Sequence, residues 1–417
     1  MVATVLAVHL LFGAAVLPAL RQSGTPFLAD GDPFLEIARN LAEGRGYSLD
    51  PGPHPTLRRM PGYPVFLAGL LRLTGGRERA AALLQVFLVA GAAALAFATL
   101  RRMGPFAAAG GALALGLHPI GLVYSSRFYS EALSVFFSAA ALFFLARSIS
   151  NERLRDHFGL CVAVAGAWLT RTTILLWAVP SLLLLALRPP FRRRPLAWLA
   201  GPALAAVLAV PWIARNHALS GEFVTGSTWN ARSALHGALI TVDPRFATHL
   251  RELDGAAAER VNADVALAFG PVDSPQKELE EDRLASQWFL SELRADPLAR
   301  MKAIGLGLVR SFYVTSSRPV RLLAGVANLG LILFALLGWR LGRERGANPF
   351  EVHLWLLVLS FWLFHSVVFP VVRYQMPALP ALTLLAGIGL QRWRARLSST
   401  PWEGERALPR PAAARSL

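Results

Sequence analysis

Lysine is almost missing from this 417-residue chain, which contains it only at Lys277 and Lys302. Arginine carries nearly all of the basic charge, and we interpret that bias as genomic base composition rather than mechanism. Charged residues make up only 16% of the sequence, hydrophobic residues make up 54%, and the mean hydropathy is +0.44. Apolar runs recur that are long enough to cross about 30 Å of hydrocarbon. The composition therefore predicts a polytopic membrane protein.

Cysteine and metal-ligand patterns are also scarce. Cys161 is the single cysteine and lies inside an apolar run, so no intramolecular disulfide can staple an external domain. The nine histidines show no ligand-like pairing, and nothing visible requires a metal or another cofactor. His118 and His365 lie inside apolar segments and are interpreted as satisfied structural residues. Any domain outside the membrane must hold itself together by packing.

The net charge of +16 raises the question of a nucleic-acid partner. The arginines, however, cluster at the ends of apolar runs and not on an amphipathic soluble face, which is the pattern of membrane topology. We therefore predict contact with a lipid bilayer and no nucleic-acid binding.

About ten spanning helices are predicted, with ten to eleven as the range. They are expected at Val2–Leu20, Arg79–Leu100, Pro105–Val123, Ser130–Ala146, Phe158–Leu169, Thr173–Leu187, Ala197–Ile213, Val320–Trp339, Phe350–Phe369 and Pro377–Leu390. The first run has no Lys or Arg ahead of it, as a secretory signal would normally have, so we predict a retained helix. The fold class is all-α.

Basic residues predict the orientation. If the segments alternate, one side holds Arg101, Arg102, Arg147, Arg153, Arg155, Arg188, Arg192, Arg193, Arg194, Arg340, Arg343, Arg345 and the tail from Arg392. The opposite short connections hold Arg127, Arg171 and Arg373. The basic side is predicted to be cytoplasmic, with both termini there.

Two long segments then face outside, at 21–78 and 214–318. In the first, Phe34–Ala42 has apolar residues at helical spacing and ends before Gly44 and Gly46, which predicts an interfacial helix. Tyr63–Leu73 predicts a second helix, too short for a confident span. In the second segment, Glu278–Leu293 predicts a charged amphipathic helix, followed by an apolar helix to Tyr313 that is either a further span or a re-entrant element.

The predicted organisation has four parts. An N-terminal transmembrane module covers 1–213 and includes the first outer loop, an outer helical segment covers 214–318, and C-terminal spanning helices cover 319–396. The Pro/Ala/Arg-rich end at 397–417 is predicted to be a disordered cytoplasmic tail.

Asp30 and Asp32 stand just beyond the first apolar run, where a side chain can meet water and still reach a lipid-borne substrate. A carboxylate there can act as a general base, especially if burial raises its pKa. The alternative is ordinary turn chemistry, with Asp32 as a cap of the helix that follows.

Charged residues beside aromatic ones recur in the other outward connections. These candidates are Arg58, Arg59, Tyr63, Arg127, Glu131, Arg215, Asn216, Arg373 and Tyr374. Each arginine alone is explained as an interfacial anchor. Gathered on the side disfavoured for positive charge, they suit a substrate with phosphate and hydroxyl groups, because arginine grips phosphate oxygens bidentately.

The order of these motifs resembles the GT-C superfamily of integral-membrane glycosyltransferases. The closest branch contains the protein O-mannosyltransferases and the lipid A aminoarabinose transferase. The resemblance is carried by Asp30, Phe34, Ala38-Arg39-Asn40-Leu41, Gly44-Arg45-Gly46-Tyr47, Arg59-Met60-Pro61-Gly62-Tyr63-Pro64, Ser130-Glu131-Ala132-Leu133, Pro211-Trp212-Ile213-Ala214-Arg215-Asn216, Arg373-Tyr374-Gln375-Met376-Pro377 and Pro380. It runs from the first predicted helix to the last, although no single motif is specific.

The resemblance implies inverting transfer of a sugar from a polyprenyl-phosphate carrier on the outer face of a bacterial cytoplasmic membrane. It implies Asp30 as catalytic base or acceptor-positioning group, with Asp32 as the alternative, and Glu131 as a second acid. Donor-phosphate contacts are implied for Arg59, Arg215, Arg373 and Tyr374, with Arg58 beside them. Tyr63, Arg127 and Asn216 are substrate-positioning candidates. The chain has Asp30-Gly31-Asp32 where relatives have an adjacent acidic pair.

Several alternatives stay open. Some superfamily members use a divalent cation, so a metal shared by Asp30, Asp32 and Glu131 is one alternative. The acceptor is a lipid, a protein or a glycan. A glycan polymerase or ligase with an oligosaccharide-lipid donor is close in chemistry. A transporter would show paired halves and charges at the membrane midplane, whereas here the charges lie at helix ends and no repeat is found.

Overall fold

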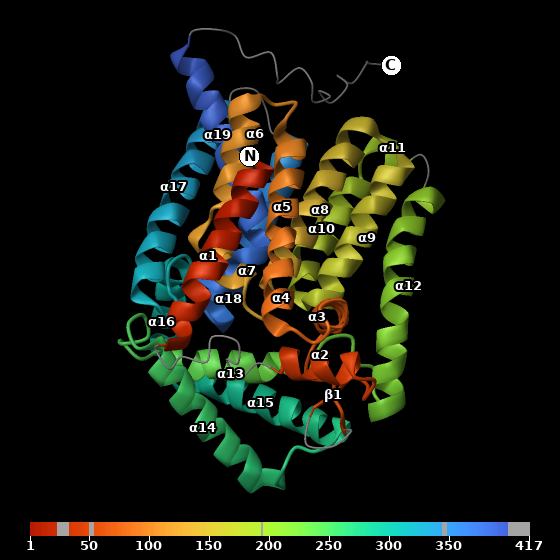
Figure 1. Cartoon of the computed structure of the whole chain (residues 1–417), viewed down its shortest axis with the longest axis vertical. Coiled ribbons are helices and arrows are strands. Elements are labelled where there is room, and N and C mark those ends of the chain that lie inside the picture. Colours follow the sequence, from red (N-terminus) through yellow and green to blue (C-terminus); the bar gives the residue numbers. More distant parts are fainter. Residues whose placement is uncertain (23–32, 50–53, 193–194, 344–347, 399–417) are drawn as a thin grey trace.

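The structure is a computed structural model that describes residues 1–22, 33–49, 54–192, 195–343 and 348–398. The described chain is helical except for two short strands, β1 (Ser48–Leu49) and β2 (His54–Pro55), which pair antiparallel. An upright bundle of helices makes up most of the molecule, and further helices lie across one end of it (Figure 1). The predicted all-α class is confirmed. Asp30, Asp32 and residues 399–417 of the predicted tail lie outside the described residues.

The bundle contains the apolar helices. They are α1 (Val2–Gln22), α4 (Glu78–Leu84), α5 (Val86–Leu100), α6 (Pro105–Gly116), α7 (Pro119–Ser125), α8 (Glu131–Asn151), α9 (Leu154–Thr170), α10 (Leu175–Ala186), α11 (Pro189–Arg192), α12 (Pro195–Ser220), α17 (Arg318–Gly342), α18 (Pro349–Val368) and α19 (Leu379–Leu397), with short 3-10 helices η1 (Thr172–Ile174) and η3 (Val372–Ala378). Helix α19 is buried along most of its length against α6 and α17. Its contact with α17 is close because Gly338 faces Gly389, and small residues let two helix backbones approach.

Five helical segments among the described residues are long and apolar enough to cross a membrane. They are Glu78–Leu100, Glu131–Asn151, Trp198–Ser220, Arg318–Gly342 and Pro349–Val368, and the bent pair α6–α7 makes a sixth if it is counted as one span. The protein is therefore a multi-pass membrane protein, with fewer spans by this criterion than the ten or eleven expected. The difference lies in short elements such as α10, and in α19, whose C-terminal turns carry Arg392, Arg394 and Arg396.

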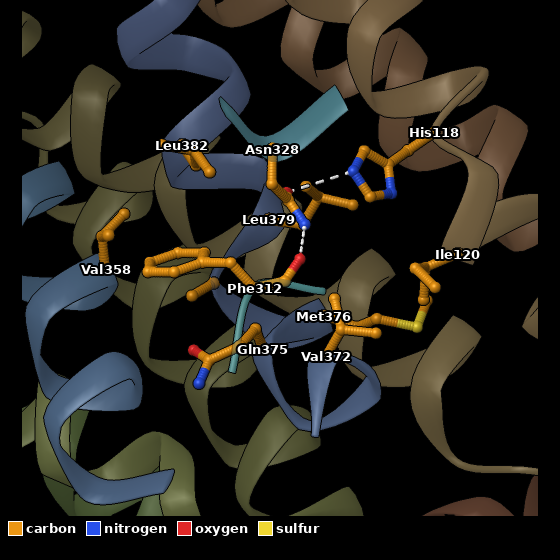
Figure 2. A pocket seen from close by; sticks show the side chains of 11 residues that line it. His118, Ile120, Phe312, Asn328, Val358, Val372, Gln375, Met376, Leu379 and Leu382 are labelled. Atoms are coloured by element: carbon orange, nitrogen blue, oxygen red, sulfur yellow. Dashed lines mark hydrogen bonds between the residues drawn. The ribbon is translucent and has the colours of Figure 1, made fainter. Parts of the chain in front are cut away.

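The bend between α6 and α7 measures 48° and falls at Leu117–His118, directly before Pro119. The residue before a proline disfavours the helical conformation, and His118 is accordingly extended, with ψ 130°. Figure 2 shows its side chain reaching across to α17, where His118 Nε2 and Asn328 Oδ1 are 3.2 Å apart. Asn328 also donates to the carbonyl of Phe312 at 2.7 Å. This polar contact therefore fastens the broken segment to α17.

A layer of helices covers one end of the bundle (Figure 1). It is formed by α2 (Phe34–Ala42), α13 (Asn230–Thr241), α14 (Leu250–Phe269) and α15 (Pro275–Ala295), with α3 (Gly62–Leu73) and α16 (Pro297–Arg310) where the layer meets the bundle. Three of the helices expected outside the membrane, at Phe34–Ala42, Tyr63–Leu73 and Glu278–Leu293, are confirmed. The apolar helix expected to reach Tyr313 is α16, and it is not among the candidate spans.

Helix α2 shows why its sequence forms a short amphipathic helix. Ile37 and Ala38 are fully buried, and the face that holds them packs against α3. The chain leaves the helix through Gly44 and Gly46, whose φ values of 81° and 86° lie in the left-handed region that favours glycine. The predicted stop of this helix is therefore confirmed by backbone geometry.

Helix α13 is held against the bundle by a close backbone approach. A Cβ atom added to Gly237 would lie 1.8 Å from the carbonyl oxygen of Val368, at the end of α18. Arg300 on α16 donates to the carbonyl of Ala238, so a buried guanidinium fixes the same helix from the side. The first turn of α13 is thus placed over the ends of the bundle helices.

The loop that precedes α3 is tied to α15. Glu278 Oε1 accepts a hydrogen bond from Thr56 Oγ1 at 2.7 Å, and Glu278 Oε2 accepts one from the Leu57 amide at 2.6 Å. The Thr228 amide donates to the Leu57 carbonyl at 3.1 Å, which adds a contact from the start of the layer. Burial raises the pKa of the Glu278 carboxyl, and these hydrogen bonds oppose that effect. The outer segment therefore sets the position of the first loop.

Candidate functional site

A cavity of about 360 Å³ lies where the layer meets the bundle. Its walls come from ends of elements that are far apart in the sequence: the loop before α3, the first turns of α8 and α13, the end of α9 with η1, the end of α18, and η3. The chemistry-bearing side chains in these walls are Arg59, Glu131, Arg171, His365, Arg373 and Tyr374. Among the described residues, three guanidiniums thus share the cavity with one carboxylate, which favours a ligand that carries negative charge.

Glu131 supplies the buried carboxylate of this cavity. Its side chain is 1% exposed, and it stands in the first turn of α8, where the helix dipole favours negative charge. Arg171 Nη2 lies 3.2 Å from Glu131 Oε1. Glu131 Oε2 has no hydrogen-bond partner within the described part of the chain. One oxygen is therefore held by Arg171, and the other is left for a further donor.

Arg373 is held by aromatic rings rather than by an acid. Its guanidinium lies 5.1 Å from the ring centre of Tyr129 and 4.8 Å from that of Tyr374. Arg373 Nη2 also donates to the phenol oxygen of Tyr374 at 2.9 Å. Ring contacts orient a guanidinium without neutralising its charge. Arg373 therefore presents positive charge in the cavity.

Arg59 is placed in a similar way on the other side. Its guanidinium lies 4.6 Å from the ring centre of Trp229, the residue before α13, and 5.3 Å from that of Phe34. The side chain is 8% exposed, and Arg59 Nη1 donates to the carbonyl of Arg58 at 3.2 Å. The position of the Arg59 guanidinium is therefore fixed by the loop that Glu278 holds in place.

His365 and Tyr374 form a stacked pair in the cavity wall. Their ring centres are 5.3 Å apart and their planes differ by 12°. Arg171 lies 5.2 Å from the centre of the same Tyr374 ring. Neither ring nitrogen of His365 has a hydrogen-bond partner among the described residues, although the side chain is only 6% exposed. The prediction that His365 is a satisfied structural residue is therefore wrong, because no polar group of the packed helices reaches its ring.

Of the residues predicted for the site, the structure brings together Arg59, Glu131, Arg373 and Tyr374. Arg58, their neighbour, is engaged elsewhere: its guanidinium lies 3.5 Å from Glu278 and 3.0 Å from Glu281, both on α15. Its charge is offset by these acids. Its predicted phosphate contact is untested, and nothing in the cavity lining supports it.

Four other predicted residues also lie outside the cavity lining. Arg215 donates to the carbonyls of Thr56 and Tyr47, both at 3.1 Å, and Asn216 donates to the carbonyl of Val224 at 3.1 Å. Tyr63 donates to Gln85 at 3.0 Å, and the Arg127 guanidinium lies 5.4 Å from the Tyr124 ring centre. These contacts hold the loop before α3, α3 itself and α12 around the cavity.

Several cavity residues, among them Arg171, Trp229 and His365, were not assigned a role from the sequence. The sequence position of Arg171 indicated a functional role, because the residue lies in one of the outward connections that are poor in basic residues. Nothing in the sequence distinguishes Trp229 and His365 from ordinary packing residues. Among the described residues, no group of three His, Cys, Asp or Glu side chains could hold a metal ion. Asp30 and Asp32, which the divalent-cation alternative involves, are outside this search.

Comparison with known proteins identifies the class. Residues 53–214 match the sequence model of a family described as dolichyl-phosphate-mannose-protein mannosyltransferase. Over this segment the chain is similar to membrane mannosyltransferases of that family. The matched segment is shorter than half of the chain and contains Arg59, Glu131 and Arg171. No curated protein matches the sequence.

Two solved structures are similar to the chain at low identity. The first is ArnT from Cupriavidus metallidurans in the apo state, with 17% identity, a TM-score of 0.41, and coverage of 94% of this chain and 78% of that chain. The second is ArnT from the same organism bound to undecaprenyl phosphate, with 17% identity, a TM-score of 0.38, and coverage of 88% and 74%. Similarity at this level assigns no residue of the cavity.

Proposed function

We propose that this cavity transfers a sugar from a polyprenyl-phosphate carrier to an acceptor at the outer face of a cytoplasmic membrane. The observation that carries the proposal is the convergence of Arg59, Arg171 and Arg373 around the buried Glu131 carboxylate at one end of a membrane bundle. A donor of this kind has a lipid chain for the bilayer, a phosphate for the guanidiniums and a sugar for the cavity. The family description names a lipid-phosphate sugar donor of the same chemical kind.

Arg373 and Arg59 are the phosphate-binding residues in this proposal. Negative charge builds up on the departing polyprenyl phosphate as its bond to the anomeric carbon breaks. Guanidiniums preset by aromatic rings stabilise that charge without reorganising at the moment of reaction. Arg171 differs from Arg373, because Arg171 forms an ion pair with Glu131 that partly neutralises its charge.

A carboxylate takes the proton of the acceptor. The acceptor hydroxyl attacks the anomeric carbon, the bond to phosphate breaks with inversion, the electron pair leaves with polyprenyl phosphate, and the proton passes to the carboxylate. Glu131 is the described candidate, because its Oε2 has no partner in the described chain while Arg171 fixes its Oε1. Asp30 is the candidate that the family resemblance implies, with Asp32 as the alternative, and both stay predictions.

The size of the cavity favours a single sugar. Small-molecule pockets commonly have volumes of about 300–1,000 Å³, and 360 Å³ is near the lower end of that range. A monosaccharide with its phosphate suits this space better than an oligosaccharide does. The observation supports a monosaccharide-lipid donor over the oligosaccharide-lipid donor of a polymerase or ligase.

The decisive experiment is transfer by purified protein from a set of radiolabelled polyprenyl-phosphate monosaccharides. We expect turnover of at least one donor by the wild type. Asp30→Asn should lower turnover by about 10²- to 10⁴-fold if Asp30 is the general base, and Asp32→Asn should have the smaller effect. Full activity in both variants would remove the first-loop carboxylates from the mechanism. No turnover of any donor would contradict the proposed reaction.

The proposed orientation follows from the basic connections. Arg101, Arg102, Arg153, Arg155, Arg188 and Arg340 lie in or beside the connections α5–α6, α8–α9, α10–α11 and α17–α18. The helix ends that carry these arginines are at the bundle end opposite the layer, and α1 begins and α19 ends in that half of the molecule (Figure 1). The preference of basic residues for the cytoplasm supports a cavity that faces outside.

Orientation is tested with a protease-cleavable tag fused after the last residue. We expect the tag to resist protease in intact spheroplasts and to be cut once the membrane is permeabilised. Cleavage in intact spheroplasts would place the C-terminus outside and invert the proposed topology.

A further inference from the structure

The cavity has a second set of polar groups that the proposed phosphate contacts do not use. His365 Nδ1 and Nε2, Glu131 Oε2 and Thr173 Oγ1 all lack a hydrogen-bond partner in the described part of the chain. All three side chains line the same cavity. Buried polar groups in folded proteins are nearly always hydrogen-bonded, and those that are not often mark a functional role. Their concentration in one cavity indicates a site for a hydrogen-bonding ligand.

These groups differ in chemistry from the phosphate side. Arg59 and Arg373 offer positive charge, whereas His365 and Thr173 offer a ring nitrogen pair and a hydroxyl, and Glu131 offers one open oxygen. Such groups match the hydroxyls of a sugar, each of which both donates and accepts a hydrogen bond. A lipid chain or an apolar side chain in this place would leave these buried polar groups without hydrogen bonds to replace those they lose to water.

Tyr374 connects the two sides. Its phenol oxygen accepts from Arg373 at 2.9 Å, while its ring face stacks on His365 with centres 5.3 Å apart. A guanidinium and an imidazole are therefore held at fixed positions on one rigid side chain. Tyr374 therefore fixes the distance between a phosphate bound by Arg373 and a linked group bound by His365.

We propose that His365, with Thr173, forms the subsite for the sugar carried by the donor, and that His365 hydrogen-bonds its hydroxyl groups. This inference rests on the proposed function and extends it by assigning the sugar and the phosphate to different residues. In this arrangement the sugar lies against His365 and the phosphate lies towards Arg373.

The test uses His365→Phe, which keeps a planar ring for stacking on Tyr374 and removes both nitrogens. Hydrogen bonds of the size typical in proteins predict a loss of kcat/KM for the sugar donor of roughly 10- to 100-fold if both nitrogens bind sugar. The inhibition constant of sugar-free polyprenyl phosphate should change by less than about twofold, because that ligand has no group for the subsite. The melting temperature should be unchanged or higher, because unpartnered buried nitrogens are removed.

A donor that lacks one sugar hydroxyl gives the sharper readout. If His365 binds that hydroxyl, the deoxy donor is poor for the wild type, while His365→Phe uses the two donors nearly equally. A purely structural role for His365 would leave the ratio between the donors as it is in the wild type.

His118→Phe is the matched control. His118 is also a buried histidine, but it lies in a separate small pocket and is bonded to Asn328 (Figure 2). Its replacement should lower the melting temperature and leave the ratio between normal and deoxy donors unchanged.

Two outcomes would overturn the sugar subsite. One is an equal effect of His365→Phe on sugar donor and on sugar-free polyprenyl phosphate, and the other is no effect on either. If Arg373→Ala also leaves both ligands unaffected, the proposed donor site itself fails, so the two failures are distinguishable.

Discussion

Glu131→Gln is expected to lower the rate of sugar transfer by about 10²- to 10⁴-fold, the usual contribution of a general acid or base. Glutamine keeps the size of the side chain and one oxygen for Arg171, but it cannot take a proton. In the variant, the amide nitrogen or the carbonyl oxygen of glutamine stands in the place of Glu131 Oε2. Neither atom can take the proton of the acceptor hydroxyl. The measurement is the single-turnover rate with saturating donor, which separates chemistry from binding.

Glu351→Gln is the matched control for that result. Glu351 is a buried acid that forms a paired contact with Arg392 at 2.7 and 2.9 Å, between α18 and α19 and away from the cavity. Removing its charge should lower the melting temperature, because Arg392 is left buried without its partner. The single-turnover rate of the folded protein should stay at the wild-type value. If Glu131→Gln also retains that rate, Glu131 is not the proton acceptor.

Arg373→Ala is expected to weaken binding of every ligand that carries the lipid phosphate. A hydrogen bond to a charged group contributes about 1.5–3 kcal/mol, which corresponds to a roughly 10- to 150-fold rise in the KM of the donor. The inhibition constant of sugar-free polyprenyl phosphate should rise by the same factor, because both ligands share the phosphate. Initial rates with increasing donor and inhibitor in detergent micelles measure both quantities.

Arg373→Lys refines this prediction. Lysine keeps the positive charge but loses the planar fork and the stacking on Tyr129 and Tyr374. Its KM should lie between those of the wild type and Arg373→Ala. A residue that only anchors the chain at the membrane interface would show no change in KM for either substitution, and that result would contradict the assignment of the phosphate site.

Several parts of the fold were predictable from the sequence. The helices at Phe34–Ala42 and Tyr63–Leu73 were predicted from apolar spacing, and glycines with positive φ end the first of them. The all-α class and the membrane location followed from composition. Fewer described segments meet the length and hydropathy criterion than the ten or eleven spans predicted. An apolar run marks burial in either lipid or protein, and α19 is buried by its neighbours along most of its length.

The candidate site was only partly predictable. Arg59, Glu131 and Arg373 were found because charged residues at the ends of apolar runs are costly unless they have a use. Arg58 could not be separated from Arg59, since the two are adjacent and differ only in their tertiary partners. His365 was interpreted as structural for the same reason, because a histidine in an apolar helix gives no sign of whether a partner faces it.

The sequence by itself determined that this is a helical membrane protein with charged groups gathered at one set of helix ends. Those properties are local: helix hydrogen bonds join residues four apart, and burial in lipid requires only a continuous apolar run. Only the tertiary structure decided which charged side chains line the cavity. That choice depends on contacts between residues more than a hundred positions apart, such as Arg58 with Glu281 and Arg59 with Trp229. Packing of the layer against the bundle creates those contacts, and no run of neighbouring residues encodes them.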